Sequence, residues 1–313
     1  MTRAAVFAYH DVGVRCLSVL LAHGLEIPLV ITHTDRPSET IWFESVAALA
    51  QAHGIPVATP ENPNDPAFIS RVAALQPDFL FSFYYRLMLA PALLGTARRG
   101  AFNMHGSLLP KYRGRVPVNW AILHGERETG ATLHEMAAKP DAGAIVDQQA
   151  VPILPNDVAL DVFRKVTTAA EMVLDRSLPR LVAGTADQHP QDLASGSYFG
   201  ARRPEDGRLD WSRSTAAIHN LVRAVAPPYP GAFCELRGGT LRILRTLDFG
   251  ERGGPKDEPA LLVRGDALLL RCADGGMLKV LSAELDGHAL TSRTMQQRLG
   301  TDSLPLINCL VDS

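Results

Sequence analysis

The sequence predicts an α/β protein in which a parallel β-sheet occupies the first half of the chain and a small antiparallel β unit follows. Two patterns in the 313 residues indicate this order. In the first half, short apolar runs alternate with amphipathic stretches, which is typical of a parallel sheet covered by helices on both faces. In the second half, strand-like runs are separated by glycine pairs, which is typical of a small antiparallel barrel.

The first half contains the elements that such a sheet needs. Residues 4–9 are a short apolar run that predicts a buried strand, and Asp11 is expected to cap the helix that follows and ends at Gly24. Further strands are predicted at residues 27–32, 56–58, 79–83 and 101–104. Further helices are predicted at residues 43–53, ended by Gly54, and at residues 65–75, capped by Asp65.

The longest helical pattern covers residues 157–182 and ends at Gly184. Its apolar positions form one stripe: Val162, Val166, Ala169, Ala170, Val173 and Leu174. Residues 185–206 are rich in turn formers and lack periodicity, so we place the connection between two domains there. A helix at residues 214–225 follows, and then strands at residues 232–236, 241–247, 261–264, 267–271 and 277–283.

Composition limits the class of protein. With 46% hydrophobic and 20% charged residues, the chain is neither disordered nor fibrous. Lys and Arg number 31 against 33 Asp and Glu, so the net charge of −2 gives no strong field for nucleic acid or an anionic membrane. The four cysteines have no C-x-x-C spacing and predict neither disulfides nor a zinc site: Cys16, Cys234, Cys272 and Cys309.

No apolar run approaches the roughly 18 residues that a membrane-spanning helix needs. The N-terminal residues also lack the basic region and long apolar stretch of a signal peptide. We therefore expect a cytoplasmic protein without membrane insertion. The sequence leaves open whether it forms a homo-oligomer.

In an open α/β sheet, ligands bind beyond the carboxyl ends of the strands. This rule selects four segments as candidates for the site: residues 9–13, 32–37, 82–86 and 103–106. The first of them reads Y-H-D-V-G, where a dinucleotide-binding protein would carry G-x-G-x-x-G. Without those glycines the backbone is not free to approach a pyrophosphate, so a dinucleotide cofactor is not expected.

The residues best suited to chemistry are Asn103, His105 and Asp141. Asn103 and His105 stand two apart at a strand end, so their side chains leave the same face. An Asn amide can stabilise a developing oxyanion, a His can carry a proton near neutral pH, and a carboxylate can assist it. These residue types also occur as structural His and turn-forming Asp. A metal site of His105, His134 and Asp141 lacks tight ligand spacing, and we predict no metal.

These residues lie within a longer motif. Asn103-x-His105 is followed by Ser107–Pro110, by Arg113–Gly114 and later by Asp141–Gly143. In this motif the chain resembles the 10-formyltetrahydrofolate-dependent formyltransferases over nearly its whole length. The resemblance implies a Rossmann-like catalytic domain at residues 1–190, a linker at residues 191–206 and an OB-like β-barrel domain at residues 207–313.

The resemblance also implies direct transfer of a formyl group from 10-formyltetrahydrofolate, a co-substrate, to an amine. His105 would handle the proton with help from Asp141, and Asn103 would hold the oxyanion. The folate site carried over from the family comprises Leu87, Met88, Leu89, Arg115, Ala137, Ala138, Lys139, Pro140 and Asp141. Leu87–Leu89 could equally be core residues at the start of a helix.

Several stretches are most similar to the family members that act on the 4-amine of UDP-4-amino-4-deoxy-L-arabinose in lipid A modification and polymyxin resistance. They include V-F-A-Y-H-D at residues 6–11 and F-S-F-Y-Y-R at residues 81–86. This likeness implies a nucleotide-linked amino sugar as the acceptor. A different UDP- or dTDP-linked amino sugar is the nearest alternative.

Two other functions have features that would distinguish them. A methionyl-tRNA formyltransferase needs basic contacts to its polyanionic acceptor, and residues 34–40 are neither long nor basic. A folate- or nucleotide-binding module without activity would not require Asn103, His105 and Asp141 together. Both are therefore less well supported than an amino-sugar formyltransferase.

Overall fold

The computed structural model describes residues 1–36, 39–236, 239–252 and 258–306. Pro37 and Ser38 of the 34–40 loop, and Cys309, lie outside the described residues. The chain divides into two compact units. Unit 1 comprises residues 1–117, 129–151 and 164–200, and unit 2 comprises residues 118–128, 152–163 and 201–313.

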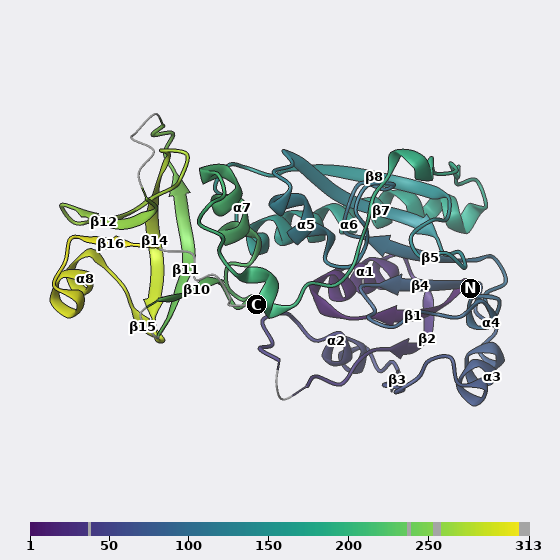
Figure 1. Cartoon of the computed structure of the whole chain (residues 1–313). Helices are drawn as coiled ribbons and strands as arrows, with labels where there is room; N and C mark the ends of the chain where they lie inside the picture. Colours follow the sequence, from purple (N-terminus) through teal and green to yellow (C-terminus); the bar gives the residue numbers. More distant parts are fainter. Residues whose placement is uncertain (37–38, 237–238, 253–257, 307–313) are drawn as a thin grey trace. The chain divides into compact units, whose positions relative to one another are not determined.

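Unit 1 is built on a seven-stranded sheet with the order β3-β2-β1-β4-β5-β7-β8 (Figure 1). The strands are β1 (Arg3–Ala8), β2 (Glu26–Ile31), β3 (Val57–Ala58), β4 (Phe79–Phe83), β5 (Gly100–His105), β7 (Glu128–Glu135) and β8 (Ile145–Pro152). The pairs from β3 to β5 are parallel, as predicted, whereas β7 runs antiparallel to β5. The chain order reverses between β1 and β4, which makes this the switch point of the sheet.

Helices cover both faces of this sheet, which confirms the predicted layering. They are α1 (His10–Ala22), α2 (Val46–Ala52), α3 (Pro66–Ala74), α4 (Pro91–Leu94) and α6 (Ala159–Ala183). Phe7 of β1 and Leu80 of β4 share a buried cluster with Val72 of α3 and Leu93 of α4. The alternate residue Ala8 faces α1. The predicted stripe of α6 is buried throughout.

The local signals for helix ends account for most boundaries. Gly24, Gly54 and Gly184 follow α1, α2 and α6 in the left-handed region, as predicted. Asp65 caps α3 by accepting the Ala67 N–H at 2.9 Å. The prediction for Asp11 was wrong, because α1 begins one residue earlier. Asp11 therefore lies in the first turn, and its Oδ1 instead accepts the Glu44 N–H at 2.8 Å.

The segment after unit 1's last helix is ordered by short elements: η1 (Leu193–Ser195), β9 (Tyr198–Phe199) and η2 (Pro204–Gly207). β9 pairs in parallel with β6 (Arg113–Gly114), which follows the sheet strand β5. Helix α5 (Pro117–Leu123) comes next in the chain after β6. Residues 197–199, which carry no sequence periodicity, are therefore fixed by main-chain pairing to the loop after His105.

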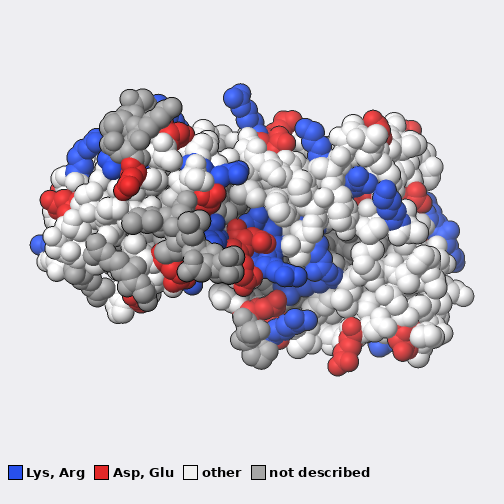
Figure 2. Space-filling model, viewed as in Figure 1, with Lys and Arg blue, Asp and Glu red and all other residues white. Residues whose placement is uncertain are grey.

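On the face drawn in Figure 2, Lys and Arg side chains lie intermingled with Asp and Glu side chains. Among the described residues, no helix is long and apolar enough to cross a bilayer.

Unit 2 carries a curled antiparallel sheet with the strand path β10-β11-β14-β13-β12-β16, and β15 pairs with β14. The elements are α7 (Thr215–Ala224), β10 (Ala232–Leu236), β11 (Gly239–Asp248), β12 (Ala260–Arg264), β13 (Ala267–Arg271), β14 (Met277–Leu285), β15 (His288–Ala289), α8 (Ser292–Leu299) and β16 (Ser303–Pro305). The predicted five strands are present. This curled sheet confirms the small OB-like β unit.

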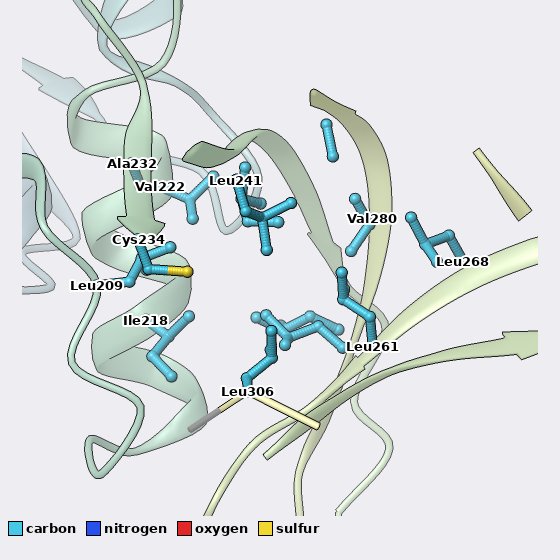
Figure 3. Packing of buried hydrophobic residues seen from close by; sticks show 14 of the residues in the cluster. Leu209, Ile218, Val222, Ala232, Cys234, Leu241, Leu261, Leu268, Val280 and Leu306 are labelled. Carbon is cyan, nitrogen blue, oxygen red and sulfur yellow. The ribbon is translucent and has the colours of Figure 1, made fainter. Parts of the chain in front are cut away.

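The core of unit 2 lies between helix α7 and the concave side of this sheet (Figure 3). Ile218 and Val222 project from α7 toward Leu241, Leu261 and other strand residues. Cys234 and Cys272 are buried in this apolar cluster, and neither forms a disulfide. Packing of one helix against a curved sheet thus stabilises unit 2 without a disulfide among its described cysteines.

Candidate active site

Strand β5 presents two predicted site residues at the carboxyl end of the sheet. Asn103 and His105 alternate with the buried Met104, so both side chains leave one face. Ser82 of β4 pairs with Asn103 on one side of the strand. On the other side, β7 places His134 opposite Asn103 and Thr132 opposite His105. The register of three strands therefore fixes where Asn103 and His105 stand.

The two ring nitrogens of His105 have different partners. Nε2 is 2.8 Å from the Tyr112 carbonyl oxygen, and because a carbonyl only accepts, Nε2 carries a proton. Nδ1 lies 3.6 Å from Oδ1 of Asp141, which is beyond hydrogen-bond distance. The residue is 6% exposed. Nδ1 is therefore the nitrogen that can gain and lose a proton, next to a carboxylate.

Asp141 is held in a turn between β7 and β8 with φ +52. Its Oδ2 accepts the Gly114 N–H at 2.9 Å. Gln191 Nε2 donates to the carbonyl oxygens of Asp141 and Gly143, at 3.0 and 2.7 Å. Burial alone would raise the pKa of the Asp141 carboxyl, but the neighbouring His105 and His134 imidazoles and the Gly114 hydrogen bond outweigh it and hold the pKa well below its usual range. Asp141 is thus a fixed negative charge.

The loop after His105 is braced so that the Tyr112 carbonyl stays in place. Ser107 Oγ donates to the Lys111 carbonyl at 2.7 Å, and Thr132 Oγ1 donates to the Ser107 carbonyl at 2.6 Å. The Tyr112 N–H donates to Ser197 Oγ at 2.8 Å. Tyr112 itself has φ +58, a left-handed conformation that is costly for a side chain of this size. Strain next to a candidate proton carrier is typical of functional sites.

The candidate folate residues fall into two groups. Leu87 and Met88 lie in the loop before α4 and are 39% and 57% exposed. Leu89 is 4% exposed and packs in the same cluster as Phe7 and Leu93. The alternative prediction was that these three are core residues at the start of a helix. Only Leu89 is a core residue, and the helix begins later, at Pro91.

The remaining candidates are Arg115 and the turn at residues 137–140. Arg115 is exposed and its guanidinium donates to the Arg86 carbonyl at 3.4 Å, which joins it to the Leu87 loop. Ala137, Ala138 and Lys139 are exposed, and Pro140 is half-buried, in the turn that leads to Asp141. Ala137, Ala138 and Pro140 have no polar side-chain atom, so a hydrogen bond to a ligand at these positions involves the main chain.

The chain matches known proteins over both units. Residues 18–178 match the family model described as formyl transferase, and residues 202–297 match that of the formyl transferase C-terminal domain. The chain belongs to the formyl transferase family. The family predicted from the Asn103–Gly114 motif is thereby confirmed, and this formyltransferase is an enzyme.

Solved structures share the fold of this formyltransferase. One is the N-formyltransferase from Helicobacter canadensis in complex with folinic acid and dTDP-3-aminofucose, with a TM-score of 0.73 and 22% identity over 90% of this chain and 99% of that chain. Another is WlaRD, a sugar 3N-formyl transferase solved with dTDP and 5-N-formyl-THF, with a TM-score of 0.71 and 19% identity over 93% and 98%. HypX from Aquifex aeolicus with tetrahydrofolic acid gives a TM-score of 0.63 and 18% identity over 94% and 47%.

Asn64 contacts the candidate folate loop and was not among the residues predicted from the sequence. Its Nδ2 donates to the Met88 carbonyl at 2.9 Å, and its Oδ1 accepts the Ala90 N–H at 2.7 Å. One side chain thus holds the main chain on both sides of Leu89. The only sequence signal was its position in the turn-forming stretch N-P-N-D-P at residues 62–66, which does not indicate what it contacts.

An aromatic cluster at the switch point was also missed: Tyr9, His10, His33, Trp42, Phe43, Tyr84 and Tyr85. His10 stacks on Phe43 with ring centroids 3.9 Å apart, and His33 stacks on Tyr85 at 4.1 Å. Tyr9, His10, His33, Tyr84 and Tyr85 belong to three of the four segments predicted to lie beyond strand ends. Their placement beyond strand ends was predicted. Trp42 and Phe43 join the cluster only through tertiary contacts with His10, which the sequence does not indicate.

The two histidines and one carboxylate weighed as a metal site do come together, but not as ligands. His134 Nε2 and His105 Nδ1 each lie 3.6 Å from Asp141 Oδ1. Among the residues for which the structure gives positions, no group of three or more His, Cys, Asp or Glu side chains is arranged to hold a metal ion. The arrangement is suited to proton transfer next to a fixed negative charge, with the Asn103 amide alongside.

Proposed function

We propose that this formyltransferase moves a formyl group from 10-formyltetrahydrofolate to the amine of a nucleotide-linked amino sugar. UDP-4-amino-4-deoxy-L-arabinose is the acceptor to test first, with lipid A modification and polymyxin resistance as the setting. One observation supports this chemistry most directly. Nε2 of His105 donates a hydrogen bond to a main-chain carbonyl, and Nδ1 of the same ring lies next to the Asp141 carboxylate.

The reaction needs a proton carrier because an ammonium has no lone pair with which to attack. As the bond from the amine nitrogen to the formyl carbon forms and the bond from that carbon to N10 breaks, the amine loses one proton and N10 gains one. His105 Nδ1 accepts the amine proton, and Asp141 stabilises the resulting imidazolium. The Asn103 amide donates to the oxygen on which negative charge develops.

The folate donor fits the exposed surface of the loop at residues 87–89. Leu87 and Met88 offer apolar side chains that no core cluster uses among the described residues. Asn64 fixes the main chain of this loop. The main chain of residues 137–141, with Asp141 at its end, supplies polar groups for the hydrogen-bonding edge of a pterin. The donor-bound complexes of WlaRD and the Helicobacter canadensis enzyme, which share the fold, support this proposal.

The aromatic cluster and a neighbouring hollow are suited to the nucleotide of the acceptor. Trp42 and Phe43 of the cluster line an open surface hollow of about 480 Å³. Its other lining residues are Asp11, Arg15, Glu44, Arg164, Thr167 and Thr168. A planar base can stack on the aromatic wall, and the exposed Arg164 guanidinium is suited to a diphosphate, whereas the Arg15 guanidinium is paired with Glu171.

The acceptor has a second candidate besides the UDP-linked sugar. Binding of dTDP-3-aminofucose by the Helicobacter canadensis enzyme favours a dTDP-linked 3-amino sugar as the second candidate. Initiator methionyl-tRNA is disfavoured, because the net charge is −2 and residues 34–40 are not basic.

The test presents each acceptor with 10-formyltetrahydrofolate and measures tetrahydrofolate release and the mass of the formylated product. The acceptors are UDP-4-amino-4-deoxy-L-arabinose, dTDP-3-aminofucose, a dTDP-4-amino hexose and initiator methionyl-tRNA. We expect kcat/KM to be highest for the UDP-linked sugar. A higher kcat/KM for a dTDP-linked sugar would make that sugar the acceptor instead. Formylation of the tRNA alone would overturn the proposal.

A further inference from the structure

His134 is a buried residue for which the proposed reaction has so far given no role. It lies on β7, is 2% exposed, and pairs in register with Asn103 of β5. A buried imidazole surrounded by strand residues needs partners for both ring nitrogens. Its partners therefore indicate what it does.

The hydrogen bonds of His134 define one tautomer. Nδ1 lies 2.8 Å from the Glu135 carbonyl oxygen, and because that oxygen only accepts, Nδ1 carries the proton. Nε2 lies 3.1 Å from Nδ2 of Asn103, and an amide nitrogen only donates. Nε2 therefore accepts, and the ring is in its Nδ1–H form. The distance of 3.6 Å from Nε2 to Asp141 Oδ1 is too long for a competing hydrogen bond.

We infer that His134 is a positioning residue that orients the Asn103 amide for catalysis. The inference rests on the proposed function, in which Asn103 stabilises the developing oxyanion. One Nδ2 hydrogen of Asn103 points to His134, and this fixes which end of the amide is the donor. The second Nδ2 hydrogen is then presented to the substrate oxygen. If the amide turned over, its oxygen would meet the lone pair of Nε2, and the donor would be lost from the site.

The inference is tested by three substitutions at position 134. Gln places an acceptor oxygen near the position of Nε2, Asn is too short to reach it, and Leu removes every polar atom. We expect His134→Gln to retain kcat within about threefold. We expect His134→Asn and His134→Leu to lower kcat by about tenfold to a hundredfold with KM for both substrates unchanged, because a misplaced donor acts on the transition state. Equal kcat for all three variants would overturn the inference.

A double-mutant cycle separates action through Asn103 from action through Asp141. In an Asn103→Ala background, measured by single turnover, His134→Leu should cost less than about twofold further. In an Asp141→Asn background it should keep its full effect. The reverse pattern, or full additivity with Asn103→Ala, would overturn the inference. Unchanged thermal unfolding of His134→Gln and Asn103→Ala, which keep a polar or small side chain, controls for folding.

A spectroscopic measurement distinguishes failure of this inference from failure of the proposed acceptor. In ¹⁵N-His-labelled protein without substrates, the His134 signals, assigned by their loss in His134→Gln, should show a protonated Nδ1 and an unprotonated Nε2. Asn103→Ala should change the Nε2 signal. A protonated Nε2 in the wild type would overturn the inference whichever acceptor the enzyme uses.

Discussion

The Nδ1 atom of His105 lies 3.6 Å from Oδ1 of Asp141, while Nε2 of the same ring is fixed 2.8 Å from the Tyr112 carbonyl oxygen. This relationship makes the two nitrogens unequal. Nε2 donates to the main chain, and Nδ1 faces a carboxylate whose own pKa is held low by His105, His134 and the Gly114 N–H, against the effect of burial. An imidazolium formed at Nδ1 is therefore stabilised without rotation of the ring.

The first prediction concerns His105 itself. Replacement of His105 by Asn keeps a polar atom near the position of Nδ1 but cannot carry the proton, so kcat should fall by about 10²- to 10⁴-fold with little change in KM. Steady-state kinetics with the preferred acceptor measure this. His53→Asn, at an exposed histidine after α2, is the matched control and should leave kcat unchanged. Near-native turnover of His105→Asn would refute the role.

The second prediction separates the donor site from the acceptor site. Asn64→Ala removes both hydrogen bonds that hold the main chain around Leu89, so the loop carrying Leu87 and Met88 loses its fixed shape. We expect KM for 10-formyltetrahydrofolate to rise about tenfold, while KM for the acceptor stays the same. Asn156→Ala, also at a half-buried Asn with one main-chain hydrogen bond, is the control. An equal rise in both KM values would contradict this assignment.

The third prediction concerns Arg164 in the hollow beside Trp42. If this hollow takes the diphosphate of the acceptor, Arg164→Ala should raise KM for the nucleotide sugar by roughly tenfold and leave KM for the folate unchanged. The effect should be largest at low salt. Arg71→Ala, on the exposed face of α3, serves as the control. An unchanged acceptor KM would exclude the hollow as the nucleotide site.

The fourth prediction concerns Gly114, whose N–H binds Asp141. Its φ is +97, and a Cβ here would collide with the Phe199 carbonyl oxygen. Gly114→Ala should therefore separate β6 from β9, lower the free energy of unfolding by about 2 kcal/mol and reduce kcat. Gly200→Ala is the matched control, since a Cβ there meets nothing within 4 Å. Chemical denaturation and kinetics of both variants provide the test; equal stability of the two would contradict the steric argument.

The fifth prediction is a loss of stability in mild acid. Burial, with the nearby Arg86, lowers the pKa of His10 to about 3 and that of His33 to about 4. Between roughly pH 6.5 and pH 4 the unfolded chain therefore binds protons that the folded chain does not, and stability decreases as the pH falls. Asp141 acts in the same direction only below about pH 4.

Unfolding midpoints in urea across this pH range measure the effect. His10→Phe and His33→Phe retain the stacking contacts with Phe43 and Tyr85 but cannot be protonated. Each should show a smaller pH dependence than the wild type between pH 6.5 and pH 4. A wild-type slope that persists in both variants would show that other groups cause it.

The sequence by itself determined the parallel half of the sheet, the capped and glycine-terminated helices, and the family. These depend on local signals: apolar runs of strand length, Asp65 as a cap, Gly24 and Gly54 as stops, and the ordered motif from Asn103 to Gly114. The two-residue spacing of Asn103 and His105 also predicted a shared face, because side-chain direction in a strand alternates.

Only the tertiary structure decided which residues meet these side chains. His134 lies 31 positions after Asn103, and its contact with the amide depends on the register of an antiparallel pair that the parallel pattern did not predict. Asn64, Gln191 and the Tyr112 carbonyl likewise reach the site through loops whose paths depend on packing. Local sequence determines which helix or strand carries a functional side chain. Which ring nitrogen of a histidine holds the proton, and which residue it contacts, are determined by neighbours from distant parts of the chain.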